Sequence, residues 1–231
     1  MERPFVSAIL PAFNEADIIS NTIKALKKIE EINEIIVVDD GSIDNTAEVA
    51  KDAGAILLKQ KENMGKGAAM TEGAKAAKGD ILVFIDADLG ASAEEARKLL
   101  VPLLRGEADV SIAKFPKADK KGGFGLVKRL ARWSVKYLGG LDLESSLSGQ
   151  RAITRQVLNY LGSFDSGFGA EVGMTIELGR GGFRLVEVQT EMTHKESGRD
   201  LAGFIHRGRQ FFHIVLVILR RFIFSKRFAR L

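Results

Sequence analysis

The chain has 231 residues, and 34 Lys and Arg against 30 Asp and Glu give a formal net charge of +4. This mild basic excess is unlike that of a protein that coats nucleic acid, so we expect no nucleic-acid partner. The sequence has no cysteine, which excludes disulfides and thiolate metal sites and fits a reducing cytoplasm; residues 1–4 carry no apolar stretch of the kind that opens a signal peptide.

Apolar runs alternate with helical patterns through the first half of the chain. We expect strands over residues 5–10, 34–38, 55–59, 81–85 and 109–114, with Pro11 ending the first of them. Helices are expected between the strands, one of them capped by Asp44 or Asn45. Such alternation predicts right-handed βαβ units: a Rossmann-like, mostly parallel sheet with helices on both faces.

Two carboxylates come directly after the apolar run 81–85. Asp86 and Asp88 are two positions apart, so both leave the strand end on the same side. That end of an open α/β sheet is where ligands bind. A hard divalent cation, Mg²⁺ or Mn²⁺, would relieve the repulsion between the two groups. The alternative is that Asp86 caps the following segment and Asp88 is solvated.

Two other strand ends bring polar residues to the same edge, namely Asn14-Glu15 and Asp39-Asp40. The turn Gly65-Lys66-Gly67 adds backbone N–H groups and one cation at a helix start, where an anion is favoured. The sequence has neither a Walker P-loop nor a G-x-G-x-x-G after its first strand. Donors for phosphate, acidic groups for ribose or base, and a pair of carboxylates for a metal together suit a nucleoside diphosphate.

Four segments in this order resemble the family 2 nucleotide-sugar glycosyltransferases of the GT-A fold: Leu10-Pro11-Ala12-Phe13-Asn14-Glu15, Val37-Val38-Asp39-Asp40-Gly41-Ser42, Gly65-Lys66-Gly67-Ala68 and Asp86-Ala87-Asp88. The resemblance implies that base and ribose are lined by Pro11, Ala12, Asn14, Glu15 and Asp39. It also implies that Gly65 and Lys66 approach the diphosphate, that Asp86 serves ribose and metal, and that Asp88 is a metal ligand with a catalytic role. For Asp40 and Ser42, a structural role in turn formation and helix capping stands as the alternative to ligand contact.

The second half begins with a Gly- and Lys-rich loop over residues 115–125, either a mobile surface loop or one that closes on substrate. A helix near residues 126–138 carries Trp133, which we expect to be a packing residue. Further expectations are a turn at 148–151 leading to a short helix after Thr154, a helix opening near 168–173, and a strand over 182–188.

This half resembles two branches of the same superfamily. Ser148-Gly149-Gln150-Arg151 is similar to the acceptor-side segment of dolichol-phosphate mannose synthases. Gly169-Ala170-Glu171-Val172-Gly173 and the segment from His194 to Arg199 look closer to glucosyl-3-phosphoglycerate synthases. That likeness implies that His194 is a metal ligand and that Arg199 meets a phosphate. The alternative is that His194 is a structural or surface residue.

The basic residues of this half suggest the chemistry of the acceptor. A sugar hydroxyl needs a positioned general base, whereas a phosphate is already an anion near neutral pH and needs cations. We expect Arg151, Lys195 and Arg199 at loop positions on the acceptor side. Glu171 is either a base or a group that orients Arg151 or a sugar hydroxyl.

From Asp200 we expect a long helix. Its apolar run, residues 211–219, is shorter than the roughly 20 residues that span a bilayer. It would pack on its own core, on the second copy of a homodimer, or on an anionic membrane at the inner face, aided by a basic tail.

We therefore expect one domain over 1–231: a nucleotide-sugar half (1–114), an acceptor half (115–199) and a C-terminal helix with a basic tail (200–231). It would move a hexose from a donor of the UDP-glucose or GDP-mannose type to a phosphate-bearing acceptor such as polyprenyl phosphate or phosphoglycerate. Two rival functions are a sugar-1-phosphate nucleotidyltransferase, whose early Gly-rich, Arg-containing loop is missing, and a nucleotide-binding module without activity.

Overall fold

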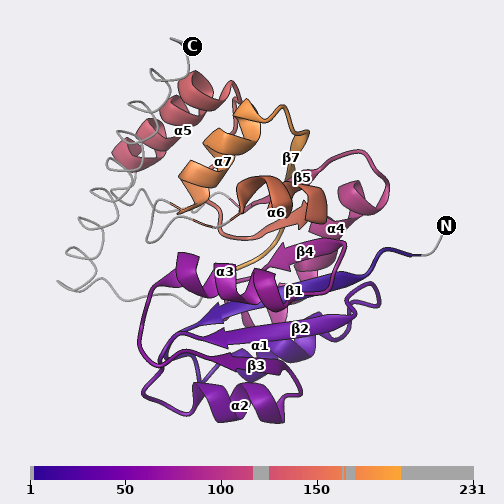
Figure 1. Ribbon diagram of the computed structural model, residues 1–231, viewed down its shortest axis with the longest axis vertical. Helices are drawn as coiled ribbons and strands as arrows, with labels where there is room; N and C mark the ends of the chain where they lie inside the picture. Colours follow the sequence, from indigo (N-terminus) through magenta and orange to yellow (C-terminus); the bar gives the residue numbers. More distant parts are fainter. Residues whose placement is uncertain (1–2, 117–124, 163, 165–169, 194–231) are drawn as a thin grey trace.

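The computed structural model describes residues 3–116, 125–162, 164 and 170–193 (Figure 1). His194, Lys195, Arg199 and the expected C-terminal helix therefore lie outside the described residues. The described strands are β1 (Val6–Ala12), β2 (Glu34–Asp39), β3 (Ile56–Lys59), β4 (Ile81–Phe84), β5 (Val110–Lys114), β6 (Arg151–Thr154) and β7 (Leu185–Gln189). The described helices are α1 (Ile19–Leu26), α2 (Thr46–Asp52), α3 (Lys66–Ala76), η1 (Gly90–Glu95), α4 (Ala96–Leu104), α5 (Gly125–Gly139), α6 (Arg155–Leu161) and α7 (Ala170–Arg180).

The strands form one mixed sheet in the order β3-β2-β1-β4-β6-β5-β7. Of its seven described strands, only β6 runs antiparallel to its neighbours β4 and β5. The expectation of a mostly parallel α/β sheet is confirmed. A helix lies between every two successive described strands, but the unit β5-α5-β6 is not a parallel βαβ unit, because β6 runs antiparallel to β5. The segment after α5 returns along residues 140–150 and enters the sheet from the opposite end as β6.

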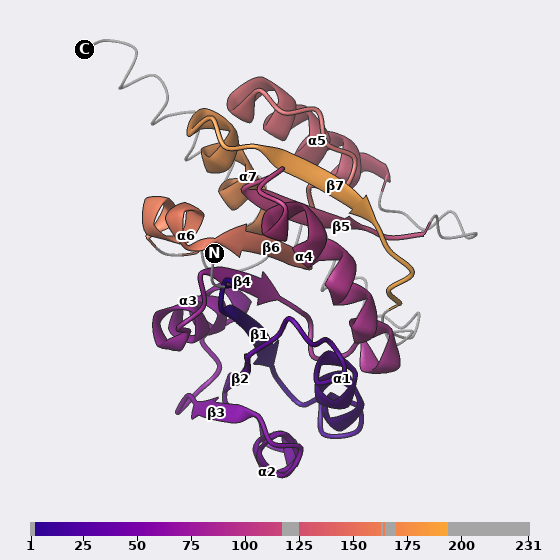
Figure 2. The ribbon, with the colours of Figure 1, turned by 90° about the vertical axis from the view of Figure 1, so that its right-hand side faces the viewer.

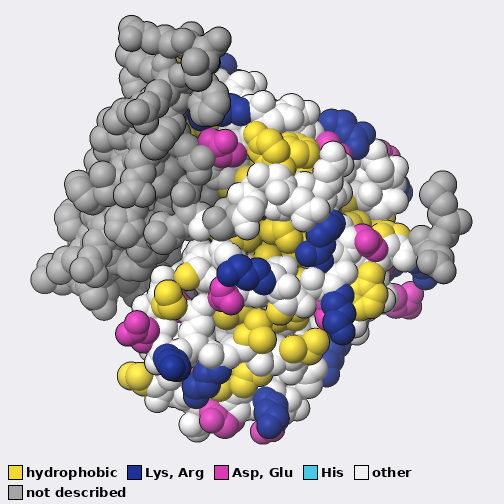
Figure 3. Space-filling view, viewed as in Figure 1, with side chains coloured by type: hydrophobic (Ala, Val, Ile, Leu, Met, Phe, Trp, Pro, Cys, Tyr) yellow, Lys and Arg dark blue, Asp and Glu magenta, His cyan; other side chains and the backbone are white. Residues whose placement is uncertain are grey.

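Helices cover both faces of the sheet, as expected. One apolar cluster joins α1, η1 and α4 to the sheet, and the other joins α3, α5, α6 and α7 to its opposite face. Figure 2 shows the sheet between α1 and α4 on one side and α3 and α6 on the other. On the surface of the described part, Figure 3 shows acidic and basic side chains interspersed.

Pro11 does not end the first strand, contrary to the prediction. It pairs in register with Val38, and Ala12 pairs with Asp39. Since the carbonyl of Ile9 faces β4, the nitrogen of Pro11 two residues later also faces that side, beyond the last paired residue of β4. A missing N–H therefore costs no hydrogen bond to a neighbouring strand there.

The structure makes two further expectations more specific. Asn45 precedes α2 without a side-chain cap, and it is Asp44 whose carboxylate accepts the amide of Thr46 at 3.0 Å. Trp133 packs against Tyr137, with ring centroids 5.1 Å apart, although half of its surface is exposed. Within the described residues, no helix has both the length and the apolar character needed to cross a bilayer.

An ion pair ties the start of β5 to the residue before β7. Asp109 Oδ1 lies 2.8 Å from Arg184 Nη2, and Oδ2 accepts from Arg184 Nε at 3.1 Å. The hydrogen bonds from Arg184 lower the pKa of Asp109. Because the folded pKa lies below the unfolded one, the pair stabilises the fold above a pH of about 4 and loses this effect as the pH falls through the folded pKa.

We predict that Asp109→Asn lowers the free energy of unfolding by about 1 kcal/mol at pH 7, since the pair is partly exposed. Urea unfolding across pH 2–7 measures this. The difference from wild type should shrink towards zero at the acid end. A difference that does not change with pH would contradict the assigned cause.

Candidate active site

The carboxyl ends of β1, β2 and β4 lie side by side in the sheet, which brings the three predicted acidic motifs to one edge. The residues after β4 include Asp86 and Asp88, both half-buried. Helix α3 begins at the same edge with Lys66 as its first residue. A cation at a helix start is opposed by the helix dipole, so nearby carboxylates must compensate it.

Carboxylates from two different elements compensate the charge of Lys66. Its Nζ lies 2.7 Å from Asp86 Oδ1 and 3.3 Å from Glu171 Oε1, the latter in the first turn of α7. Burial disfavours the ammonium, but Asp86 and Glu171 outweigh this and raise the pKa of Lys66. Lys66 is therefore fully charged at neutral pH. Its Nζ joins Asp86 to Glu171, which lies 85 positions later in the sequence.

The antiparallel course of β6 closes the site. Phe84 pairs with Arg151, so the residues just before β6 lie next to those just after β4. Gly149 lies against Lys66 and Asp86: a methyl group there would overlap Lys66 Nζ and approach Asp86 Oδ1 to 3.4 Å. A larger residue there would push the Lys66 ammonium out of its present position. The sequence predicted that the segment containing Gly149 lies on the acceptor side, but it did not indicate the contact of Gly149 with Lys66 and Asp86.

Arg151 is not at a loop position, contrary to the prediction. It lies in β6 with no exposed surface, and its guanidinium donates to the carbonyl of Ser148 and to Thr175 Oγ1. Burial lowers the pKa of Arg151 to about 10, and the charges of Glu171 and Asp86 only partly offset this. A guanidinium under the site cannot reach an acceptor in solvent, so its contacts support β6 and α7 instead.

The carboxylate of Glu171 does not orient Arg151, which was one of the alternatives. Arg151 Nη1 approaches the main-chain oxygen of Glu171 at 3.5 Å, while the side chain is directed to Lys66. Glu171 is buried and stands at a helix N-terminus, where a negative charge is favoured. The site therefore presents an anion–cation–anion row: Glu171, Lys66 and Asp86.

Asp39 keeps one carboxylate oxygen without a partner. The residue is completely buried; Oδ1 accepts the amide of Ser42 at 3.0 Å, and Oδ2 has no hydrogen-bond partner within the described residues. A buried carboxylate oxygen without a donor is costly, and a bound N–H or O–H group would satisfy it. Asp39 has no exposed surface in this structure, so a ligand donor would reach Oδ2 only once the residues that cover it move.

Asp40 and Ser42 have the structural roles that the sequence left open. Asp40 accepts the amides of Met64 and Gly65, both at 2.8 Å, and so shapes the turn before Lys66. Gly65 has φ +92° and ψ 156°, a backbone conformation that residues other than glycine rarely adopt. Ser42 Oγ accepts the amide of Asn14 at 2.9 Å.

We predict that Asp40→Ala lowers the free energy of unfolding by about 2 kcal/mol, because two amides lose their buried acceptor. For a chain of this size the melting temperature should fall by about 4–8 °C. Asp40→Asn keeps one acceptor oxygen and should fall between alanine and wild type. A melting temperature unchanged by alanine would show that Asp40 does not hold this turn.

The loop after β1 is fixed by the same network. Asn14 has φ 58°, a left-handed conformation that asparagine tolerates, and its Oδ1 accepts the amide of Ile43 at 3.0 Å. The amide of Glu15 donates to Thr46 Oγ1 at 2.8 Å. Pro11 is half-buried and Ala12 is buried. The predicted base-lining loop is thus held by side-chain hydrogen bonds and lies beside Asp39.

A divalent metal fits the two carboxylates after β4 only with further ligands. Among residues 3–116, 125–162, 164 and 170–193, no three His, Cys, Asp or Glu side chains cluster closely enough to hold a metal. The carboxylates of Asp86 and Asp88 supply hard oxygen donors of the kind Mg²⁺ and Mn²⁺ prefer. The last described residue, Thr193, exchanges hydrogen bonds with Ser92, four positions after Asp88.

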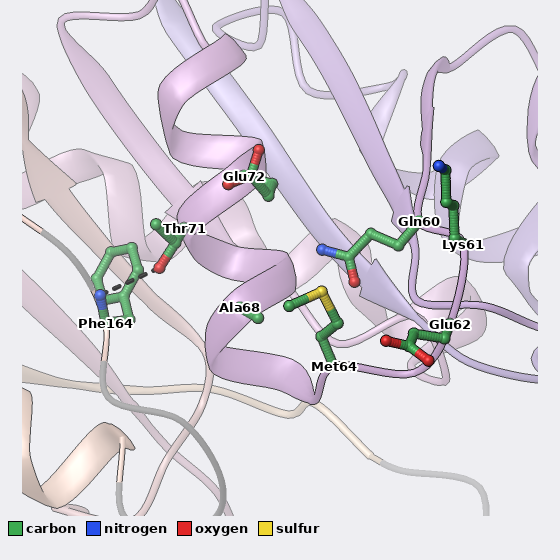
Figure 4. A pocket seen from close by; sticks show the side chains of 8 residues that line it. All are labelled: Gln60, Lys61, Glu62, Met64, Ala68, Thr71, Glu72 and Phe164. Carbon is green, nitrogen blue, oxygen red and sulfur yellow. Dashed lines mark hydrogen bonds between the residues drawn. The ribbon is translucent and has the colours of Figure 1, made fainter.

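A separate pocket of about 530 Å³ lies between α3, the loop after β3 and Phe164 (Figure 4). Figure 4 shows the side chains of Gln60 and Met64 extending from the loop after β3 towards the helix. The pocket is lined by Gln60, Lys61, Glu62, Met64, Ala68, Thr71, Glu72 and Phe164. None of the predicted site residues is among them, so the candidate active site is the strand-end cluster rather than this pocket.

The fold is an α/β fold of the GT-A type, with the strand-end cluster at the carboxyl edge of its sheet. The model of the Glycosyl transferase family 2 matches residues 7–168, and the chain belongs to this family. Glycosyltransferase AglJ of Haloferax volcanii is 30% identical over 201 residues, covering 84% of this chain and 65% of AglJ. Glucosyl-3-phosphoglycerate synthase of Mycobacterium tuberculosis is 31% identical over 196 residues, covering 74% of this chain and 60% of the synthase.

The fold is confirmed by a crystal structure of the mycobacterial synthase in complex with Mn²⁺, UDP and phosphoglyceric acid. It superposes with a TM-score of 0.79 at 28% identity, covering 94% of this chain and 78% of that one. The chain spans less than two thirds of the length of the curated relatives described above.

Proposed function

We propose that this protein is a metal-dependent glycosyltransferase that moves a hexose from a nucleoside diphosphate sugar to a phosphate-bearing acceptor. The observation that carries the proposal is the meeting of Asp86, Lys66 and Glu171 beside the buried Asp39, at the edge where β1, β2 and β4 end. The family and the ligands named in the mycobacterial complex support the same assignment.

The donor would lie across the strand ends. Asp39 Oδ2 would accept an N–H of the base or a hydroxyl of the ribose, with Pro11, Ala12, Asn14 and Glu15 forming the wall. Gly65 and Lys66 would approach the diphosphate, since an ammonium and helix-start amides both favour an anion. A donor of the UDP-glucose or GDP-mannose type meets these requirements.

The metal would be held by Asp86 and Asp88, with His194 proposed as a further ligand because it follows Thr193. When bound, Mg²⁺ or Mn²⁺ would stabilise the negative charge that builds on the departing diphosphate. Lys66 adds a second positive charge at the same place, where a preorganised charge stabilises the transition state most.

The acceptor phosphate would be bound by Lys195 and Arg199, which follow in sequence. Arginine holds a phosphate through two parallel charge-assisted hydrogen bonds, which lysine cannot reproduce. Glu171 is buried beside Lys66 and is proposed to face the transferred sugar. Arg151 is assigned a positioning role beneath Glu171 rather than contact with the acceptor.

Mass spectrometry of products tests the proposal. The protein is incubated with Mn²⁺, UDP-glucose or GDP-mannose, and acceptors with and without a phosphate, including phosphoglycerate and a short polyprenyl phosphate in vesicles. We expect a hexosylated product from a phosphate-bearing acceptor only. Release of a sugar 1-phosphate with pyrophosphate as co-substrate would instead identify a nucleotidyltransferase, and no product with any donor would contradict the proposal.

A further inference from the structure

Lys66 occupies the place that the proposed metal and donor must share. Its ammonium lies 2.7 Å from Asp86 Oδ1, an oxygen of a proposed metal ligand, and 3.3 Å from Glu171 Oε1. Gly149 closes in behind it so tightly that even a methyl group would overlap Nζ. A divalent ion held by Asp86 would lie close to this ammonium, and the repulsion between the two cations would weaken metal binding while Lys66 stays in place.

We propose that Lys66 is a resident counter-ion that neutralises Asp86 and Glu171 before the donor arrives, and that it leaves Asp86 for the donor's diphosphate as the metal binds. The inference rests on the proposed function for the identity of the incoming groups. Its consequence is that metal binds weakly to the free protein and strongly with the nucleotide.

The same exchange prepares Glu171. While Lys66 is in place, the carboxylate of Glu171 is engaged by the ammonium from a different element. Once Lys66 moves to the diphosphate, Glu171 is free to meet the donor sugar. The buried guanidinium of Arg151, beneath the first turns of α7, keeps a positive charge near Glu171 throughout. A lone buried carboxylate would be costly without it.

Mn²⁺ binding to the nucleotide-free protein tests the inference, with the electron paramagnetic resonance signal of free Mn²⁺ as the readout. Lys66→Met should bind Mn²⁺ more tightly than wild type, within the roughly 5- to 150-fold range of typical site couplings. Lys66→Arg keeps the charge and should stay close to wild type. Lys61→Met, an exposed position in the neighbouring loop, makes the same change in net charge and is the matched control.

Equal Mn²⁺ affinity in Lys66→Met, Lys61→Met and wild type would overturn the inference. If Lys66→Met does not fold, Lys66→Gln replaces it, and circular dichroism of every variant verifies folding. UDP and GDP are then titrated into wild type with Mn²⁺. Failure of both to bind would contradict the proposed function, whereas the nucleotide-free comparison would still decide whether Lys66 excludes the metal.

Discussion

Replacement of Asp88 by Asn should abolish metal-dependent turnover of the donor while leaving the fold intact. The side chain is half-buried at a strand end rather than in the core, and Asn has almost the same shape. It lacks the negative charge that makes a carboxylate a strong ligand for a hard divalent cation. We expect the rate of donor hydrolysis or transfer with Mn²⁺ to fall by roughly 10²- to 10³-fold, the loss typical for a preorganised charge-stabilising group.

Steady-state kinetics at several Mn²⁺ concentrations, together with thermal unfolding, measure this effect. Asp52→Asn, at the exposed end of α2, removes the same charge away from the site and should leave both rate and stability unchanged. If Asp88→Asn retained the wild-type dependence on Mn²⁺, the assignment of Asp88 as a metal ligand would be wrong.

Arg151 gives the largest expected effect on stability. Arg151→Ala removes a completely buried side chain and leaves the carbonyl of Ser148 without its donor. We expect the free energy of unfolding to fall by about 3 kcal/mol, as for other large-to-small changes in a core. Arg151→Met fills most of the same space and also removes a charge whose burial is unfavourable, so it should cost about 1 kcal/mol.

The methionine variant separates the packing role of Arg151 from its positioning role. Without the guanidinium, Ser148 and the first turns of α7 lose a shared anchor, and Glu171 loses a nearby positive charge. We expect kcat for transfer to fall about 10- to 100-fold in a variant that remains folded. Urea unfolding and the separate measurement of kcat and KM test this; unchanged kcat in Arg151→Met would leave Arg151 with a packing role alone.

The first half of the molecule could be predicted because its sequence signals are local. Each of the strands β1, β2 and β4 is mainly an apolar run with a polar residue at its end or within two positions after it, and parallel strands deliver those residues to one edge. The predicted end of the first strand at Pro11 was wrong because the effect of proline depends on which neighbouring strand its nitrogen faces. The order of strands in the sheet determines this, and the local sequence does not reveal it.

The site beneath the strand ends could not be predicted in the same way. β6 is four residues long and begins with an arginine, so its pattern did not distinguish a strand from a turn. The burial of Arg151 depends on groups of α7 more than twenty residues away. Gly149 was named only within a motif, and its contact with Lys66 follows from the antiparallel direction of β6.

Isothermal titration of UDP and GDP into the wild-type protein and Asp39→Asn, each with and without Mn²⁺, tests the central claim most directly. One nucleotide should bind wild type with an affinity that rises on adding Mn²⁺. Asp39→Asn should weaken that binding about tenfold or more, because the buried oxygen no longer offers a charged acceptor to the ligand. If neither nucleotide bound in the presence of Mn²⁺, the strand-end cluster would not be a nucleotide-sugar site.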